Sequence, residues 1–263
     1  MATTIWEFAL LGAATGALYV LGAMGLVLTY RGSGVVNFAL GIMGMAGAFA
    51  YWELHDVFHW PLVIALILGV GLSALLGWAN HLLMLPLRLA SNLTRIIVTL
   101  DVLIVLEGLL ALKYPATNTY TTQPILPTSP VKIFGASVGA DRLYLIAIAV
   151  VLTAVISVFY KRSRVGLATS AVAENQAAIA TLGWSPNAIA GANWAAGAGL
   201  AGLAAILLSP VTGLSVGLAT SLLLPGLAAA VIGNLRSFPL TLAGGLAIGI
   251  VQSELQRYVT IQG

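Results

Sequence analysis

Long uninterrupted runs of apolar residues dominate this chain. A helix rises about 1.5 Å per residue, so about 20 residues cross the hydrocarbon core of a bilayer. The runs predict eight such spans, at about 5–29, 35–52, 61–83, 93–112, 142–160, 187–208, 219–233 and 238–257. The second and the seventh are short and rich in glycine. We expect either to be broken or re-entrant, because irregular backbone at membrane depth is tolerated where protein buries it.

The composition narrows the class of protein. The 263 residues are 60% hydrophobic and only 7% charged, whereas a soluble domain carries about 25% charged residues. This excludes a cytosolic enzyme, a nucleic-acid binder and a disordered regulator. A β-barrel would show alternating segments of about ten residues instead of long apolar runs. We therefore predict an all-α, polytopic membrane helix bundle with a single transmembrane domain over residues 1–263.

The basic residues between the spans predict the orientation, because cytoplasmic connections are enriched in Lys and Arg. With the N-terminus outside, seven basic residues lie inside and four lie outside. The inner ones are Arg31, Arg88, Arg95, Lys161, Arg162, Arg164 and Arg236, and the outer ones are Lys113, Lys132, Arg142 and Arg257. The even number of spans then places the C-terminus outside as well.

The longer outer connection covers about residues 113–141. It contains four prolines and many Thr and Tyr residues. Its last part, residues 131–138, predicts a small hairpin with Gly135 in the turn.

The longer inner connection covers about residues 161–186. Its alanine-rich stretch from Gly166 to Leu182 predicts a helix that ends at Gly183. Pro186 then opens the next span, where its missing N–H costs little. The inner helix is too polar and too short to span, so it either lies among lipid headgroups or docks a cytosolic partner.

Ionisable residues at membrane depth are the rarer signal. Asp101 lies near the middle of the fourth span and Glu107 nearer its outer end. They are six positions apart, about 240° around a helix, so they do not share a face. An intramembrane acid suggests a translocation path or proton site, and a hydrogen bond to a neighbouring span is the structural alternative.

Two asparagines are further candidates for a polar site. Asn37 and Phe38 precede a series of glycines that begins at Gly41, a pattern typical of a broken helix in a transporter. Asn193 lies inside the sixth span. Helix capping or a hydrogen bond between helices explains either asparagine equally well.

Small residues are spaced for close helix packing. They form the pairs Gly12 and Gly16, and Gly245 and Gly249, and the ridge Gly191, Ala195, Ala198 and Gly202. Such ridges let helix backbones approach closely where lipid supplies no hydrophobic drive. They predict a compact bundle and say nothing about a substrate.

The sequence predicts no catalytic or metal chemistry. There is no cysteine, and His55, His59 and His81 lack the spacing of metal ligands. No P-loop, HExxH or GxSxG motif occurs. We expect no enzyme activity and no cofactor in this chain, so any ATP and Mg²⁺ belong to a partner.

Three stretches resemble the permease subunits of ABC importers for branched-chain amino acids, over nearly the whole chain. They are GLVLTYRGSGVVNFALGIMGMAGAFAYW, RSRVGLATSAVAENQAAIATLGWSPNAIAGANWAAGAGLAGLAAILL and LLLPGLAAAVIGNLRSFPLTLAGGLAIGIVQSEL. The second is the most specific, because the inner loop and the following small-residue span match together.

The resemblance implies a function and a set of partners. The chain is then a multi-pass protein of the bacterial inner membrane that imports a small solute by alternating access. Its partners are cytosolic ATP-binding subunits, a second permease subunit and an external solute-binding protein, which faces the loop 113–141.

The resemblance also implies roles for individual residues. The inner loop supplies a coupling helix that docks the ATP-binding subunit, with Arg164, Gly166, Glu174, Ala177 and Gly183 as its candidates. The translocation path is expected near Asn37, Phe38, Gly41, Asp101, Glu107 and Asn193.

The chain departs from the family pattern in three places. Leu40, Gly41 and Ile42 stand where amino-acid permeases often carry His, Gly and an acid, so the site is more apolar. Asp101 and Glu107 replace Gly and Gln, which suggests a changed path or a contact with the second permease. The family's last span is expected to be missing after residue 257.

Two other classes of transport protein stay open. One is a proton-coupled secondary transporter that uses Asp101 or Glu107 as its proton site. The other is a passive channel for a small neutral solute such as urea. Neither requires a docking helix in the inner loop, and that loop favours the importer.

Overall fold

The computed structural model describes residues 2–115, 117–133, 136–174 and 176–262. Its α-helices are α1 Ala2–Ser33, α2 Leu40–Trp52, α3 Leu62–Met84, α4 Asn92–Lys113, α5 Ala140–Arg162, α6 Arg164–Glu174, α7 Gln176–Thr181, α8 Pro186–Thr212, α9 Leu218–Ile232 and α10 Phe238–Gln262. A π-helical turn, η1 Glu53–Val57, extends α2. Five of these helices, α1, α3, α5, α8 and α10, are long and apolar enough to cross a membrane. The protein is therefore an all-α, polytopic membrane helix bundle.

Three further helices coincide with the other apolar runs of the sequence. Helix α4 has 22 residues but carries several charged side chains. Helices α2 and α9 have only 13 and 15 residues, fewer than the roughly 20 needed to cross a bilayer. The second run is helical only from Leu40, because residues 34–39 between α1 and α2 are not helical. We call this non-helical segment the break before α2.

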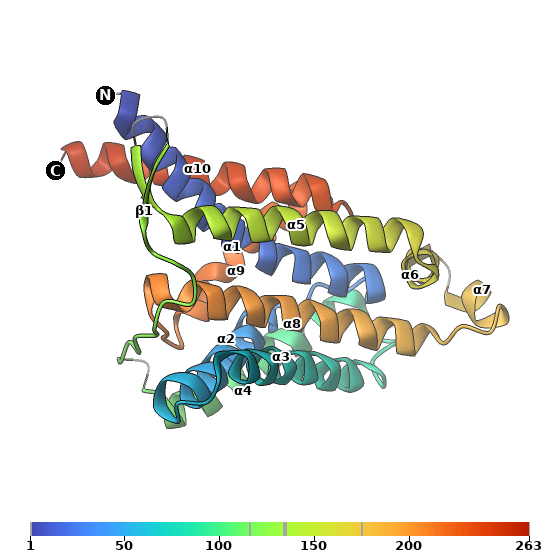
Figure 1. Cartoon of the computed structure of the whole chain (residues 1–263). Helices are drawn as coiled ribbons and strands as arrows, with labels where there is room; N and C mark the ends of the chain where they lie inside the picture. The colour runs from blue at the N-terminus through green and yellow to red at the C-terminus, as the bar shows by residue number, and fades with distance from the viewer. Residues whose placement is uncertain (1, 116, 134–135, 175, 263) are drawn as a thin grey trace.

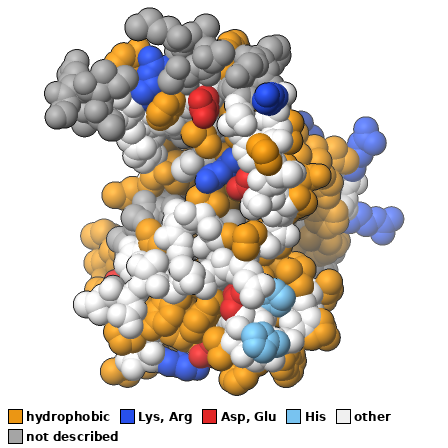
Figure 2. Space-filling view, turned by 60° about the vertical axis from the view of Figure 1, so that its left-hand side comes forward, with side chains coloured by type: hydrophobic (Ala, Val, Ile, Leu, Met, Phe, Trp, Pro, Cys, Tyr) orange, Lys and Arg blue, Asp and Glu red, His pale blue; other side chains and the backbone are white. Residues whose placement is uncertain are grey.

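The long helices lie side by side, and the two ends of the bundle differ (Figure 1). Both termini and the hairpin lie at one end, whereas α6 and α7 lie at the other. The loops predicted to lie outside and inside are thus at opposite ends. In Figure 2 the end with the termini faces the reader, and charged and histidine side chains are scattered over it between apolar ones.

The predicted hairpin is present in the outer loop. Strands β1 Pro130–Ile133 and β2 Ala136–Gly139 pair antiparallel, with Val131 opposite Val138. The predicted turn residue, Gly135, lies outside the described residues.

The inner loop is helical on both sides of residue 175 within the stretch expected to be a helix from Gly166 to Leu182, and residue 175 lies outside the described residues. Helix α6 begins two residues earlier, where the Ser163 Oγ accepts a hydrogen bond from the Gly166 N–H at 3.0 Å. A second helix, α7, ends just before Gly183, whose φ of +82° confirms the expected helix terminator. Pro186 opens α8 as predicted.

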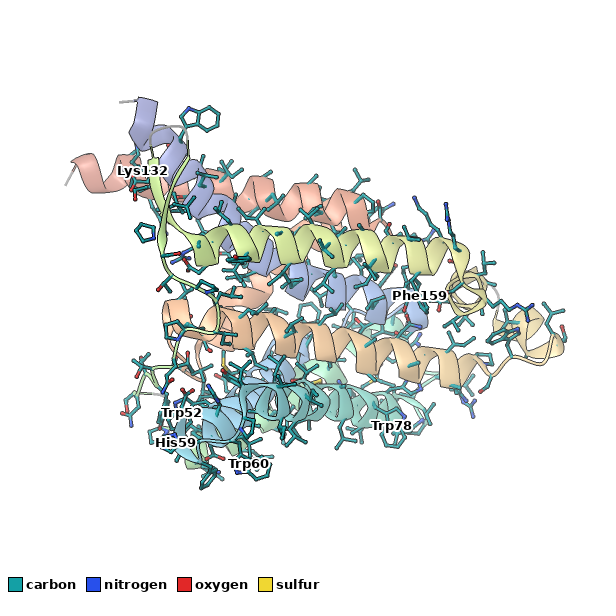
Figure 3. The ribbon with its side chains drawn as sticks, in the orientation of Figure 1. Trp52, His59, Trp60, Trp78, Lys132 and Phe159 are labelled. Atoms are coloured by element: carbon teal, nitrogen blue, oxygen red, sulfur yellow. The ribbon has the colours of Figure 1, made fainter. Side chains whose placement is uncertain are left out.

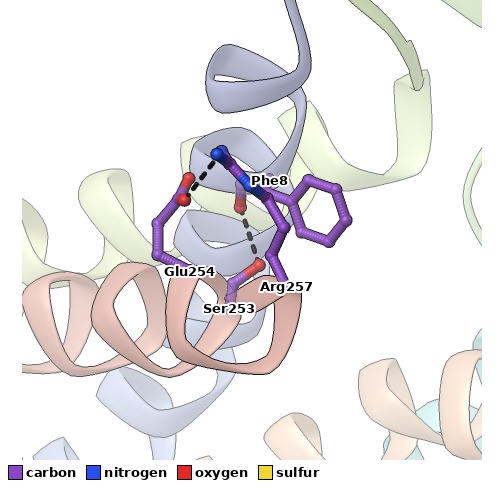
Figure 4. Close-up of polar contacts among 4 residues, drawn as sticks. All are labelled: Phe8, Ser253, Glu254 and Arg257. Carbon is purple, nitrogen blue, oxygen red and sulfur yellow. Dashed lines mark hydrogen bonds and ion pairs between the residues drawn. The ribbon is translucent and has the colours of Figure 1, made fainter. Parts of the chain in front are cut away.

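The small-residue pairs of α1 and α10 pack directly against each other. A Cβ on Gly12 would lie 2.6 Å from the Gly249 carbonyl oxygen, and one on Gly16 would lie 2.5 Å from that of Gly245. At the outer end of the same interface the Ser253 Oγ donates to the Phe8 carbonyl at 2.8 Å. Figure 4 shows this bond beside the ion pair of Glu254 with Arg257. The glycines thus let the backbones of α1 and α10 touch, although about 230 residues separate these glycines in the sequence.

Exposed tryptophans mark the two ends of the outer surface. Trp60 and Trp78 are 45% and 46% exposed, and in Figure 3 Trp60 lies near Trp52 and His59 whereas Trp78 lies farther toward the other end. Trp60 lies just before α3 and Trp78 lies 16 residues into it from Leu62, which corresponds to about 24 Å of helix. This approaches the thickness of the hydrocarbon core, and tryptophan is enriched at both membrane interfaces.

Candidate functional site

The irregular segment of residues 34–39 contacts α3 and α4, and Val35, Asn37 and Ala39 within it are buried. Asn37 is fully buried. Its Oδ1 accepts hydrogen bonds from the Ala39 N–H at 3.0 Å and from the Asn80 Nδ2 at 3.3 Å. The Phe38 N–H donates to the Thr99 Oγ1 at 3.2 Å. A side chain of α3 thus binds the Asn37 side-chain amide, and a side chain of α4 binds the backbone N–H of Phe38.

This polar cluster is only partly satisfied. The Asn37 Nδ2 and the Asn80 Oδ1 are buried and have no hydrogen-bond partner among the described residues. A buried polar group without a partner costs about 1–3 kcal/mol. The break before α2 therefore contains one amide nitrogen and one neighbouring amide oxygen without a partner among the described residues, and neither asparagine lines either of the two nearby cavities.

The break lies well inside the bundle. Leu40, the first residue of α2, packs beside Gly25 of α1, since a Cβ on that glycine would lie 2.9 Å from the Leu40 Cδ2. Gly25 precedes the end of α1 at Ser33 by eight residues, which is about 12 Å of helix. The N-terminal, electropositive end of α2 is thus placed at membrane depth, as in the discontinuous helices of many transporters.

Two cavities lie on either side of this break. The outer cavity, of about 50 Å³, is apolar and is lined by Gly22, Gly41 and Ala201 among others. The inner cavity, of about 340 Å³, is more polar and reaches Ser33, His81 and Trp194. Candidate Gly41 therefore lines a cavity.

A buried tryptophan forms part of the wall of the inner cavity. Trp194 and Ala201 are seven residues apart on α8, about 10 Å along the helix. Trp194 is fully buried, and its indole N–H donates to the Ser33 Oγ at 2.9 Å. One side chain and its hydrogen bond thus hold the end of α1 against α8 where the inner cavity ends.

Candidate Asn193 is buried at a junction of three helices and lines neither of these cavities. Its Nδ2 donates to the Thr169 Oγ1 of α6 at 3.2 Å and to the Ile189 carbonyl at 2.7 Å. Its Oδ1 accepts from the Tyr160 hydroxyl of α5 at 2.6 Å. Asn193 therefore ties α6 to the transmembrane helices, which is the structural alternative considered for it.

Arg31 ties α6 to the bundle a second time, a role that sequence reasoning missed. Its guanidinium donates to the Ser170 Oγ of α6 at 2.8 Å and to the Arg236 carbonyl at 3.4 Å. It also lies 5.3 Å from the ring centroids of both Tyr160 and Phe238. The sequence marked this arginine only as a cytoplasmic charge, because none of its partners is close to it along the chain.

The coupling candidates are distributed along α6 and α7. Arg164 begins α6 and is exposed. Gly166 packs so closely on the Tyr160 backbone that a Cβ there would collide with it. Gly183 ends the element in the left-handed conformation. The side chains of Glu174 and Ala177 lie outside the described part of the chain.

The two acids of α4 are not brought into the cavities. Asp101 is exposed and Glu107 partly exposed, and neither has a hydrogen bond or ion pair within the described chain. Thr99 is the buried residue of this helix. Both acids therefore lie on or beside a helix face that the rest of the chain leaves open.

The outer loop covers the outer ends of α2 and α8. Tyr120 and Leu214 exchange two backbone hydrogen bonds of 2.8 Å, and the Thr122 hydroxyl meets that of Ser209 at 2.9 Å. Tyr114, just past the end of α4, stacks on Phe49 with ring centroids 4.0 Å apart. Burial and the neighbouring Glu53 carboxylate raise the pKa of Tyr114, so this hydroxyl stays protonated.

These features define a multi-pass membrane protein with a non-helical segment between α1 and α2 inside the bundle and a helical element at one end. The family model for the permease component of branched-chain amino acid transport systems matches residues 8–262. The chain belongs to this family. It is thus a membrane subunit of a transport system, which implies partner subunits, and it is not an enzyme.

Relatives with known names agree with this assignment. The high-affinity branched-chain amino acid transport system permease protein LivH of Salmonella typhimurium is 24% identical over 95% of this chain and 86% of its own length. BraD of Pseudomonas aeruginosa is 26% identical over 92% of this chain and 83% of its own. The probable permease LivH of Methanocaldococcus jannaschii is 27% identical over 92% and 78%. No solved structure matches the chain.

Proposed function

We propose that this chain is the membrane subunit of an ATP-driven importer that moves branched-chain amino acids, or a related small solute, inward by alternating access. The names of its relatives support the substrate class. The chain would cross the bacterial inner membrane eight times, with α2 and α9 as short crossings and both termini outside.

One observation carries this proposal: α6 is attached to the transmembrane helices by two independent polar contacts. Asn193 binds Thr169, and Arg31 binds Ser170. A force applied to α6 by a cytosolic ATP-binding subunit would therefore reach α8 and α1. Helix α1 ends at the break before α2. A secondary transporter or a channel has no need of such an element.

The path would run past the break before α2. The two cavities on either side of it, the unsatisfied amides of Asn37 and Asn80, and the electropositive start of α2 support this route. The backbone groups around Phe38 and Gly41 would line it. An external solute-binding protein would deliver the solute at loop 113–141, and a second permease subunit would complete the assembly.

The test is uptake of labelled leucine into proteoliposomes that contain the assembled complex. Glu174→Arg places the opposite charge on the proposed coupling element. We expect ATP hydrolysis by the partner to continue while uptake falls at least roughly tenfold, as for the loss of one charge-assisted contact. Normal uptake by this variant would overturn the docking assignment.

Leu89→Arg is the matched control. It introduces the same side chain at a 98% exposed position in the loop between α3 and α4, at the same end of the bundle. We expect its uptake to equal that of the wild type. If it loses uptake as Glu174→Arg does, the effect belongs to surface charge and not to docking.

A further inference from the structure

The inner cavity carries positive charge without a compensating acid. Arg88 and Arg95 both line it, and among its described lining residues there is no Asp or Glu. Neither arginine forms an ion pair within the described chain, and Arg95 bonds only the Asn92 side chain. Arginines in cytoplasmic loops usually lie on the protein surface and set the orientation of the protein in the membrane. These two arginines line a cavity instead.

A buried imidazole faces the same cavity. His81 is 6% exposed, and neither of its ring nitrogens has a hydrogen-bond partner among the described residues. The backbone of Asn187 is the polar group near the ring, and it lies outside hydrogen-bonding geometry. The ring packs on Gly191, where a Cβ would lie 3.0 Å from its Cδ2. The Arg95 Nε is also buried without a partner.

Much of the remaining lining is apolar, although Ser33 and Asn187 also belong to it. Val35, Met84 and Trp194 are buried and form one hydrophobic cluster beside the charged groups. A ligand that satisfies both parts has one oxyanion and a short aliphatic body. Guanidinium groups bind carboxylates and phosphates with charge-assisted hydrogen bonds, and the neutral imidazole supplies one donor and one acceptor.

We propose that the inner cavity is a binding site for a small amphipathic oxyanion, held by Arg88, Arg95 and His81. Two sources have this chemistry. One is the carboxylate of the transported amino acid on its way to the cytoplasm, an assignment that rests on the proposed function. The other is the phosphate of an anionic phospholipid of the inner leaflet. Binding of either would favour the conformation in which this cavity is open.

The experiment measures binding to the purified full chain in nanodiscs of phosphatidylcholine, without ATP or partner subunits. The probes are leucine, isovalerate, which keeps the carboxylate without the amine, and isopentylamine, which keeps the amine without the carboxylate. We expect leucine and isovalerate to bind and isopentylamine not to bind. In nanodiscs with phosphatidylglycerol, lipid occupancy would appear as weaker leucine binding and as retained lipid in native mass spectrometry.

Variants locate the site. Arg88→Gln and Arg95→Gln should each weaken oxyanion binding roughly tenfold, since each removes one charge-assisted bond, and Arg95→Lys should restore part of the loss. Arg162→Gln is the matched control, because it removes an exposed cation at the same end of the bundle that does not line the cavity. Size-exclusion chromatography of each variant reports folding, and Arg88 is exposed, so its substitution leaves the packing intact.

The inference is overturned if leucine, isovalerate and phosphatidylglycerol all fail to bind. It is equally overturned if isopentylamine binds as tightly as isovalerate, or if both glutamine variants bind like the wild type. Normal oxyanion binding without ATP-driven uptake by the assembled complex would instead refute the proposed function alone.

Discussion

Helices α8 and α4 have similar lengths and contrasting surroundings. Within its most apolar window α8 is 61% buried, and most of its buried residues are Gly and Ala packed on α1, α2 and α3. Helix α4 has Thr99 as its buried residue and exposes large aliphatic side chains such as Ile104 and Leu112. In a bilayer, small residues mark the helix that packs inside, and large ones mark the helix that faces lipid or another subunit.

Their polar residues differ in the same way. The Asn193 amide of α8 has a partner for each of its heteroatoms. The Asp101 carboxylate of α4 has none within the described chain. An unpaired acid at membrane depth costs about 2.5–3.5 kcal/mol on insertion scales. The comparison therefore indicates that α8 belongs to the packed interior of the chain. Helix α4 lies at a surface that we expect lipid or another subunit to cover.

The largest expected effect comes from filling the α8 interface. A Cβ on Gly197 would lie 2.6 Å from the Gly25 carbonyl oxygen of α1. Gly197→Leu should therefore prevent correct folding, because a backbone cannot shift as a flexible side chain does. The measurement is the yield of monodisperse protein in fluorescence-detected size-exclusion chromatography.

Gly108→Leu in α4 is the matched control, since nothing lies within 4 Å of a Cβ at that position. Its yield should equal that of the wild type. Equal losses in both variants would show that the two helices do not differ in packing as the structure indicates.

The next effect concerns the buried junction at α8. Asn193→Ala leaves the Tyr160 hydroxyl and the Thr169 side chain without this partner. Each loss costs about 1–3 kcal/mol at a buried site, so the Tm in detergent should fall clearly. It should also loosen α6 and lower ATP-driven uptake. An unchanged Tm would show that the hydrogen bonds of Asn193 do not stabilise the bundle.

Substitution of the α4 acid should have a smaller effect on the isolated chain. Asp101→Asn removes a charge that no described group binds and that costs free energy at membrane depth, so the Tm of the isolated chain should not fall below that of the wild type. Under the importer proposal it alters assembly or substrate preference and creates no proton dependence. The measurement is leucine uptake at constant ATP with and without a protonophore. Wild-type uptake that a protonophore abolishes would favour the secondary transporter.

The smallest effect is expected at the outer end of α4. Lys113 and Glu53 form an ion pair of 2.6 Å, but the lysine side chain is 63% exposed. Exposed pairs contribute about 0–1 kcal/mol. Lys113→Gln should therefore shift the Tm by less than Asn193→Ala does. A larger shift would mean that the outer loop depends on this pair.

Much of the fold follows from local sequence signals. The apolar runs predict the helices to within a few residues, apart from the break before Leu40. The hairpin at residues 130–139, the end of α7 at Gly183 and the start of α8 at Pro186 were also predictable. Each signal is contained in a few consecutive residues, because hydrophobicity, backbone φ and the absent proline N–H act locally.

The site was less predictable. Asn37 and Gly41 were recognised as candidates, and the structure places both beside the break or the outer cavity. Asn193 and Asp101 looked alike in sequence, as single polar residues in apolar spans. Only the fold shows that one has three partners and that the other has none in the described chain.

The sequence by itself determined that this protein is a polytopic helical membrane protein, how its loops divide between two ends, and which family it resembles. The tertiary structure alone decided that Gly12 meets Gly249, that Arg31 holds α6, and that Arg88, Arg95 and His81 face one cavity. The physical reason is distance along the chain. Apolar runs and caps act within one helical turn or one span, whereas packing and charge pairing join residues that can be more than 200 positions apart.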